Sequence, residues 1–329
     1  MPSVKTDVEI AYRGSRDGDA EAIVAFLREC GYDPDERFWH WINRECPQGA
    51  AMVELALAGD RVVGHYAVLP RLLHVGGTTV KAGHAIHAAV HPQFRGLAIL
   101  QGLMRRVVQT CQEAGLRLLY AFPNENIWLV YLKLFAWREI GDLVALECGL
   151  QDSEPADTDP PNVSWSDRIQ FDARYQPFKR MEILQGKTYI MKDPAYLNWR
   201  YARHPRVRYQ LLEAHTAAGE LGGYAVLKLY EKHDVRYGHV VDLGVQLATL
   251  DMIPQLLSKA LIVFRRQQVN RASCWLLNDT PFVDAARAMG FRATGFSTHV
   301  GYRLLDPHFP MSHLSLERWH LVMGDSDAF

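Results

Sequence analysis

The chain has 329 residues, of which 48% are hydrophobic and 22% are charged. These fractions are typical of a globular protein and exclude collagen-like, disordered and coiled-coil chains. With 36 lysines and arginines against 37 aspartates and glutamates, the formal net charge is −1. This balance gives no electrostatic reason to expect nucleic acid or a membrane as a partner.

Three features of the sequence predict a cytoplasmic protein. No apolar run approaches the ~20 residues of a membrane-spanning helix. Asp7 precedes the first apolar segment, which does not fit a signal peptide. The five cysteines are scattered and form no C-x-x-C pair, so we expect reduced thiols and neither a disulfide scaffold nor a metal site.

The first half alternates predicted strands with predicted helices. Apolar runs and residue alternation indicate the strands, and apolar positions three to four residues apart indicate the helices. Gly59-Asp60 joins two apolar runs and predicts a hairpin. The predicted strands are Val8–Arg13, Ala51–Ala58, Arg61–Pro70, Lys81–Val90, Leu116–Phe122 and Arg138–Cys148, and the predicted helices are Gly18–Cys30, Ile99–Ala114 and Ile127–Phe135.

A polar segment divides the chain near its middle. Residues 151–162 carry four acids, three prolines and no base. Such a segment cannot bury an apolar face, and each proline disfavours a helix before it. We therefore expect a linker over 151–164 that separates a domain at 1–150 from a domain at 165–329.

The second half repeats the first. The segment Gly64–Leu69 recurs as Gly222–Leu227, at an offset of 158 that also relates Trp41 to Trp199. Further along, an offset of 154 relates Gln101 to Gln255, Leu103 to Leu257, Asn124 to Asn278 and Gly141 to Gly295. An ordered series at two offsets indicates a duplication. Two unrelated mixed domains are the alternative.

The change of offset falls where the first half carries a distinctive loop. Residues Val90–Ala98 lie between an apolar strand and an amphipathic helix, with Arg95 and Gly96 at the turn. Amide groups at such a turn, together with the helix dipole, suit a pyrophosphate. The corresponding junction of the second half, Gln246–Asp251, has neither glycine nor arginine. An ordinary turn before a surface helix is the alternative to an anion site.

The motif Gln93-x-x-Gly96-x-Ala98, preceded by Val90-His91-Pro92, resembles the pyrophosphate loop of the GNAT superfamily of acyl-CoA-dependent N-acyltransferases. The predicted order of strands and helices is also similar to that fold. The resemblance implies an α/β (α+β) protein with two tandem GNAT-like domains. Each would be a mixed, mostly antiparallel sheet flanked by helices, and the second would be a degenerate repeat that lacks the pyrophosphate loop.

The resemblance also implies a co-substrate, acetyl-CoA or another acyl-CoA. It would lie where the strand ending at Val90 separates from the strand ending at Phe122. The family's asparagine after the second of these strands is matched by Asn124. The implied cofactor-binding residues are Ala88, Ala89, Val90, Gln93, Phe94, Arg95, Gly96, Leu97, Ala98, Ile99, Leu100 and Asn124.

Acyl transfer to an amine needs a base, stabilisation of the oxyanion and a proton for the leaving thiolate. Backbone amides of Ala88–Val90 are candidates for the oxyanion. His84 is the candidate base, and Glu54, an acid in an apolar strand, is a reserve base. The resemblance makes Tyr131 the candidate proton donor. The alternatives are a hydrogen-bonded structural histidine, a tyrosine that fills the buried face of its helix, and a solvated glutamate.

The candidate acceptor-binding residues are Trp39 and His87. His87 has the opposite parity to His84 on one strand, so we expect the two side chains on opposite faces of the sheet. That expectation also argues against a metal pair. Trp41 recurs as Trp199 and is therefore expected to be structural, whereas Trp39 has no aromatic counterpart. Cys111 is expected in the core.

The sequence thus predicts an N-acyltransferase, in the simplest case an N-acetyltransferase. The acyl group would pass by direct attack, in a ternary complex, to the primary amine of a small polar acceptor such as an amino sugar. We expect one CoA per chain, with the second half helping to wall the acceptor cleft. The alternative is a non-catalytic CoA-binding sensor or assembly module. The acyl chain length and the oligomeric state stay open.

Overall fold

The computed structural model describes residues 9–95, 97–150, 159–275 and 281–328. Gly96 of the predicted pyrophosphate loop, residues 151–158 of the predicted linker and Asn278 of the repeat lie outside the described residues, as do residues 1–8.

Every strand and helix predicted in the first half is present, with ends that differ by a few residues. Helix α2 is additional, and it forms because Asp35 caps it by accepting a hydrogen bond from the Phe38 amide at 2.7 Å. The elements are β1 (Ile10–Gly14), α1 (Ala20–Glu29), α2 (Glu36–Arg44), β2 (Met52–Ala58), β3 (Arg61–Val75), β4 (Thr78–Val90), α3 (Leu97–Glu113), β5 (Leu118–Ala121), α4 (Glu125–Leu134) and β6 (Arg138–Gly149).

The second half repeats this order from β9 onward. Its elements are β7 (Val163–Ser166), β8 (Tyr189–Ile190), α5 (Pro194–Leu197), β9 (Tyr209–His215), β10 (Leu221–Lys232), β11 (Val235–Val245), α6 (Met252–Arg266), β12 (Arg271–Trp275), α7 (Pro281–Ala288) and β13 (Arg292–Leu304). Only the pairs β4–β5 and β11–β12 are parallel among the described strands. The predicted fold class, a mixed and mostly antiparallel sheet flanked by helices, is confirmed.

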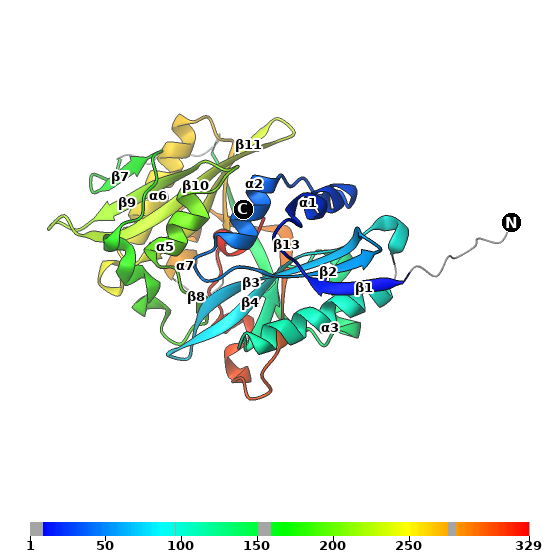
Figure 1. The fold of residues 1–329 in the computed structure, drawn as a ribbon. Coiled ribbons are helices and arrows are strands. Elements are labelled where there is room, and N and C mark those ends of the chain that lie inside the picture. Colours follow the sequence, from blue (N-terminus) through cyan, green and yellow to red (C-terminus); the bar gives the residue numbers. More distant parts are fainter. Residues whose placement is uncertain (1–8, 96, 151–158, 276–280, 329) are drawn as a thin grey trace.

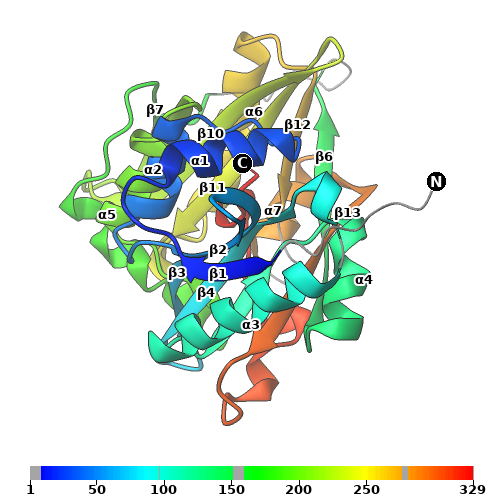
Figure 2. The same cartoon turned by 45° about the vertical axis from the view of Figure 1, so that its right-hand side comes forward.

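The two halves share one continuous sheet, which runs across the molecule in Figures 1 and 2. Its order is β1-β2-β3-β4-β5-β13-β6-β12-β11-β10-β9-β7. Strand β13 of the second half pairs with β5, and β6 of the first half pairs with β12. Each half therefore completes the sheet of the other with its last strand. The sequence did not predict this exchange, which joins the two predicted domains through one core.

Two tryptophans mark the contact between the repeats. The indole N–H of Trp41 donates to the carbonyl of Trp199 at 2.9 Å, and the indole N–H of Trp199 donates to the carbonyl of Trp41 at 3.0 Å. Their rings stack with centroids 4.9 Å apart. The two halves thus contact each other reciprocally through these two residues, as across an approximate two-fold axis.

Helices cover both faces of the first half of the sheet. Helices α3 and α4 pack on one face through a core that includes Leu103 and Trp128, and α1 and α2 pack on the other through Ile23 and Trp41. Figure 2 shows α3 and α1 on opposite sides of β1 to β4.

The end of the predicted linker belongs to the second half, because Asp159 pairs with Lys259 at 2.6 Å and β7 begins at Val163.

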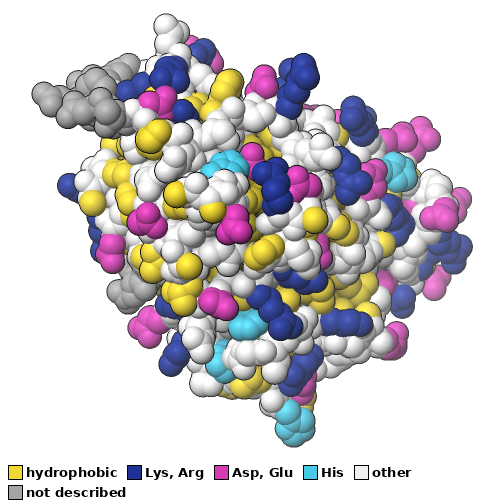
Figure 3. Space-filling model, turned by 90° about the vertical axis from the view of Figure 1, so that its left-hand side faces the viewer, with side chains coloured by type: hydrophobic (Ala, Val, Ile, Leu, Met, Phe, Trp, Pro, Cys, Tyr) yellow, Lys and Arg dark blue, Asp and Glu magenta, His cyan; other side chains and the backbone are white. Residues whose placement is uncertain are grey.

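In the part of the chain that the structure describes, no helix is both long enough and apolar enough to cross a membrane. On the side shown in Figure 3, acidic and basic side chains alternate, and neither sign gathers into one large patch. This distribution agrees with the balanced charge of the whole chain.

Candidate functional site

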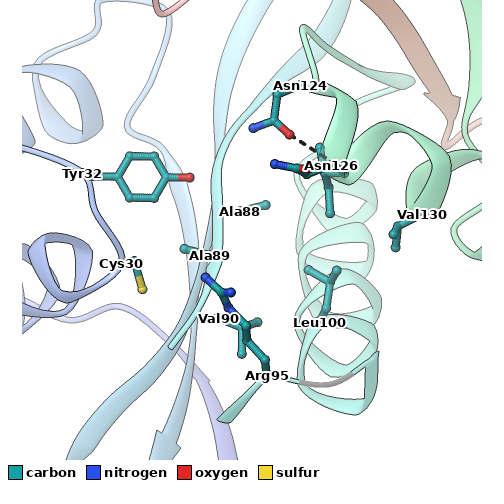
Figure 4. Close-up of a pocket in the computed structure, with 11 residues that line it drawn as sticks. Cys30, Tyr32, Ala88, Ala89, Val90, Arg95, Leu100, Asn124, Asn126 and Val130 are labelled. Atoms are coloured by element: carbon teal, nitrogen blue, oxygen red, sulfur yellow. Dashed lines mark hydrogen bonds between the residues drawn. The ribbon is translucent and has the colours of Figure 1, made fainter. Parts of the chain in front are cut away.

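Strands β4 and β5 separate in the middle of the first half. Their parallel pairing covers only Ala82 to His84 on β4, although β4 continues to Val90. A pocket of about 420 Å³ opens between the end of β4 and helix α4, and a second of about 200 Å³ adjoins it toward the point of separation. Figure 4 shows the first pocket between these two elements. We call the two pockets together the cleft.

Half of the predicted cofactor-binding residues line the first pocket. They are Ala88, Ala89, Val90, Arg95, Leu100 and Asn124. Gln93 and Phe94 line neither pocket and form a short 3₁₀ turn before α3. The side chain of Ile99 is buried in the core, and Ala98 lies exposed in the first turn of α3. Of Leu97 the structure describes only its place at the start of α3.

The loop before α3 is held in shape by His91. Its ring nitrogen accepts a hydrogen bond from the Gln93 amide at 3.2 Å. The other ring nitrogen lies 2.9 Å from the Arg61 guanidinium and 3.2 Å from the Glu29 carboxylate. Arg95 lines the pocket just beyond this turn. Arg95, before α3, and Leu100, in the first turn of α3, line the same pocket. A helix N-terminus with a nearby arginine suits an anion.

The opposite wall of the pocket is the first turn of α4. Asn124 caps this helix, because its side-chain oxygen accepts from the Ile127 amide at 3.2 Å. Figure 4 shows the amide nitrogens of Asn124 and Asn126 on the side of the pocket that faces β4. The sequence did not single out five of the lining residues, which follow α1 or lie on α4: Cys30, Tyr32, Asn126, Ile127 and Val130.

A β-bulge in β4 brings two histidines together. Opposite the three residues His65–Ala67 of β3, β4 places the four residues Ile86–Ala89. His87 lies in the bulge with φ of +47°. The extra residue reverses the alternation of side chains beyond it. The prediction that His84 and His87 face opposite sides is therefore wrong.

Both histidines approach the carboxylate of Asp327. The Nε2 atoms of His84 and His87 lie 3.7 and 3.9 Å from its oxygens. The ring of His84 is 1% exposed and stacks on Tyr120 with centroids 4.9 Å apart. Burial lowers the pKa of His84 to about 3 and also lowers the pKa of His87. Both imidazoles are consequently neutral at pH 7.

Tyr131 lines the second pocket from α4. Its hydroxyl lies 2.7 Å from the hydroxyl of Tyr66, and its ring stacks on Trp137 at 4.7 Å. The chain turns between these two rings at Ala136, whose φ is +52°. Burial raises the pKa of Tyr131 above its usual range. The phenol is therefore protonated at neutral pH and is able to donate a hydrogen bond.

Three predicted catalytic or acceptor-binding residues line neither pocket of the cleft: Glu54, Trp39 and His84, which lines a separate cavity of about 20 Å³. The carboxylate of Glu54 accepts hydrogen bonds from Arg106 and Thr110 of α3, each at 2.8 Å. Its ion pair occupies the face of β2 covered by α3, so Glu54 is neither a free base nor a solvated side chain. Trp39 is 2% exposed within the core and lines neither pocket of the cleft. Cys111 is buried, as expected.

Asp327 reaches the cleft from the second half. The buried guanidinium of Arg200 donates to the carbonyls of Gly324 and Ser326 at 3.0 and 3.1 Å. These contacts fix the backbone directly before Asp327. No motif in the sequence marks this residue, because its position depends on the fold of both halves.

A buried ion triad holds the same segment. The Lys192 ammonium lies 2.8 Å from the Asp325 carboxylate and 2.9 Å from that of Asp242 on β11. All three side chains are almost fully buried. Because a buried charge is stable only when paired, the triad ties the chain end to β11.

This segment fills the position in the second half that corresponds to the cleft. Strand β11 pairs with β12 only over Tyr237 to Val240 and separates beyond it. Gly324 lies against the next residue, Val241, so closely that an added Cβ would lie 3.1 Å from the Val241 carbonyl oxygen. The space that is open beside β4 is therefore occupied beside β11.

Comparison with known proteins agrees with this architecture. Residues 11–132 match the family model described as an acetyltransferase (GNAT) domain. Residues 11–132 belong to the GNAT superfamily. No curated protein matches the chain. The GNAT segment runs from β1 into α4 and so contains both walls of the cleft.

Solved structures similar to this chain extend over both halves. One is a probable N-acyltransferase of unknown function from Enterococcus faecalis V583, with a TM-score of 0.67, 9% identity and coverage of 91% of this chain and 73% of that chain. A GCN5-related N-acetyltransferase from Anabaena variabilis has the same TM-score and coverages at 13% identity. N-myristoyltransferase from Saccharomyces cerevisiae, solved with bound myristoyl-CoA, has a TM-score of 0.62, 10% identity and coverages of 92% and 80%. At these identities the similarity shows the shared fold.

Proposed function

We propose that the cleft binds acetyl-CoA, or another short acyl-CoA, and transfers the acyl group to a primary amine. The acceptor would be a small polar amine, such as an amino sugar, that attacks directly in a ternary complex. The observation that carries the proposal is the opening between β4 and β5, with Arg95 lining one of its pockets, and His87 and Asp327 lining the other.

The residues of the first pocket fit the parts of CoA. Arg95 and the first amides of α3 would hold the pyrophosphate. The edge of β4 at Ala88–Val90, which has no parallel partner in β5, would pair with the amides of the pantetheine arm. The capping residue Asn124 lies on the opposite wall. In this proposal the GNAT segment supplies the whole CoA site, and the second half is a degenerate repeat without one.

Aromatic rings support a short acyl group. His84 stacks on Tyr120, and Phe122 meets both rings edge-on with centroids 5.4 and 6.1 Å away. These three side chains fill the point where β4 and β5 separate. A long acyl chain would have to displace them, and such close packing resists added volume.

The remaining groups would move protons. A neutral imidazole of His84 or His87 would accept a proton from the amine, and the protonated phenol of Tyr131 would give a proton to the departing thiolate sulfur. Backbone amides at Ala88–Val90 would stabilise the charge that develops on the thioester oxygen. Each of these groups lines the cleft or contacts Asp327 at its inner end.

Measurement of free thiol released from acetyl-CoA, with a panel of amines, tests the proposal. We expect release that depends on the amine and yields the acetylated amine by mass spectrometry. If CoA binds but no amine accelerates release, the protein is instead a CoA-binding sensor or assembly module.

Replacing His84 with alanine is expected to lower kcat about 10²-fold or more, because general-base catalysis contributes at least that factor. Tyr131→Phe should lower kcat less, because the cleft keeps its shape and water can protonate the thiolate. CoA affinity, measured by calorimetry, should be unchanged in both variants. A fully active His84→Ala protein would assign the base to His87 or to a water-relayed group.

A further inference from the structure

We infer that Asp327 is the residue that selects the acceptor, and that the acceptor enters the cleft as a primary ammonium ion. This inference rests on the proposed function and specifies its substrate class. The acceptor would be an alkyl amine, which carries a positive charge at neutral pH, rather than an aromatic amine or an alcohol.

Asp327 is the only charged residue among the described residues that line the second pocket. Its side chain is 26% exposed. At 3.7 and 3.9 Å, the nitrogens of His84 and His87 are too far away for direct hydrogen bonds. In the part of the chain that the structure describes, we find no hydrogen bond to this carboxylate. Its open side therefore offers a negative charge to whatever occupies the pocket.

Two buried guanidinium groups lie behind Asp327, on the side away from the second pocket. A small cavity of about 20 Å³ on that side is lined by Arg71 and Arg200. Arg71 packs over the ring of Trp199 at 5.3 Å, and Arg200 is tied to the backbone of the chain end. Neither residue lines the second pocket, so the cation that meets Asp327 there would come from the acceptor.

The position of Asp327 is fixed by the fold. Residues Gly324–Ser326 are buried and are held by the Arg200 hydrogen bonds and the Lys192 ion pair. A carboxylate one residue beyond such anchors has little freedom to move away. Holding an acceptor within reach of the thioester is itself a large contribution to rate.

The chemistry at this position balances. The ammonium group would bind Asp327 and lose one proton to the imidazole of His84 or His87. The freed nitrogen lone pair then forms the N–C bond as the C–S bond breaks. The imidazole passes the first proton to solvent and then accepts the second proton from the nitrogen. The sulfur takes up a proton from Tyr131, and the imidazole returns the second proton to the Tyr131 phenolate through water, so the net reaction releases one proton to solvent. Asp327 itself keeps its charge throughout and acts as a positioning residue.

The test is the variant Asp327→Asn, which keeps the shape and removes the charge. We expect KM for the best alkyl amine to rise about 10- to 100-fold, as for loss of a charge-assisted hydrogen bond. The affinity for CoA and the unfolding temperature should stay unchanged, and Asp327→Glu should restore part of the affinity for the amine. Asp284→Asn removes an equally negative residue from the exposed surface of α7 and is the matched control.

An unchanged KM in Asp327→Asn would overturn the inference, provided that the wild-type protein acylates amines. If Asp327→Asn has no measurable turnover, calorimetric binding of the amine to the CoA complex decides: lost binding supports the inference, and retained binding overturns it. If the wild-type protein acylates no amine, the proposed function itself fails. The two failures are therefore distinguishable.

Discussion

Lowering the pH from 7 to 5 is expected to reduce the free energy of unfolding by several kcal/mol. Four buried histidines cause this, because burial lowers the pKa of His65 and His239 to about 4 and that of His84 and His320 to about 3. In the unfolded chain each has a pKa near 6.5. Between these values only the unfolded chain binds the protons, so stability is lost as the pH falls below 6.5.

The size of this effect follows from the number of protons taken up. Each group contributes ~1.4 kcal/mol per pH unit within its window, so four together contribute at most ~5.5 kcal/mol per unit. Since a domain typically has ~5–15 kcal/mol of stability, we expect unfolding somewhat above pH 4. Urea titrations followed by circular dichroism at pH 7.5, 6.5, 5.5 and 5.0 measure the slope.

Two matched variants distinguish the effect of protonating the buried histidines from other effects of acid on stability. His320→Gln should reduce the slope by about one proton, because it removes one buried titrating group. His308→Gln, at an exposed histidine, should leave the slope unchanged. A free energy of unfolding that is flat between pH 7 and 5 would contradict this account.

Replacing Lys192 with methionine is expected to destabilise the protein by about 3–5 kcal/mol, the usual effect of removing one partner from a buried ion pair. The substitution leaves the carboxylates of Asp242 and Asp325 buried without their cation. It should also release the segment that carries Asp327, so the KM for the amine should rise in protein that remains folded.

Differential scanning calorimetry and amine kinetics measure the two effects of Lys192→Met. We expect the midpoint of unfolding to fall by roughly 10 °C. The control is Lys232→Met, the same substitution at an exposed lysine at the end of β10. Because it removes no buried ion pair, it should shift the midpoint little. A Lys192→Met midpoint within 2 °C of the wild type would show that the triad is not the anchor.

Local sequence patterns predicted most strands and helices of the first half, because each pattern lies within a contiguous run of residues. The alternation around β2 to β6 and the glycine-ended helix α3 predicted the order of elements. The loop at Gln93–Ala98 predicted a site beside the end of β4, where the structure has a pocket. The repeat offsets paired Trp41 with Trp199 and predicted a structural role for Trp41, but they did not predict that the two rings contact each other. Each of these signals lies within one element or between two copies of the same segment.

The remaining features depend on contacts between distant segments. The bulge at His87 changes parity through one extra residue, which apolar alternation in β4 does not show. Strand β13 pairs with β5, and β6 pairs with β12. Because β6 and β13 are equivalent strands of the two halves, either one could pair with the same strand edge. Glu54 is satisfied by Arg106, 52 positions away, and Asp327 is positioned by Arg200. No local pattern distinguishes these outcomes.

The claim that the chain has one acyl-CoA site, between β4 and α4, is tested most directly by calorimetric titration of the intact protein with CoA. We predict a stoichiometry near one, and a loss of at least about tenfold in affinity for Arg95→Glu, which reverses a charge at the mouth of that pocket. A stoichiometry near two, or an affinity for CoA that Arg95→Glu leaves unchanged, would contradict the claim.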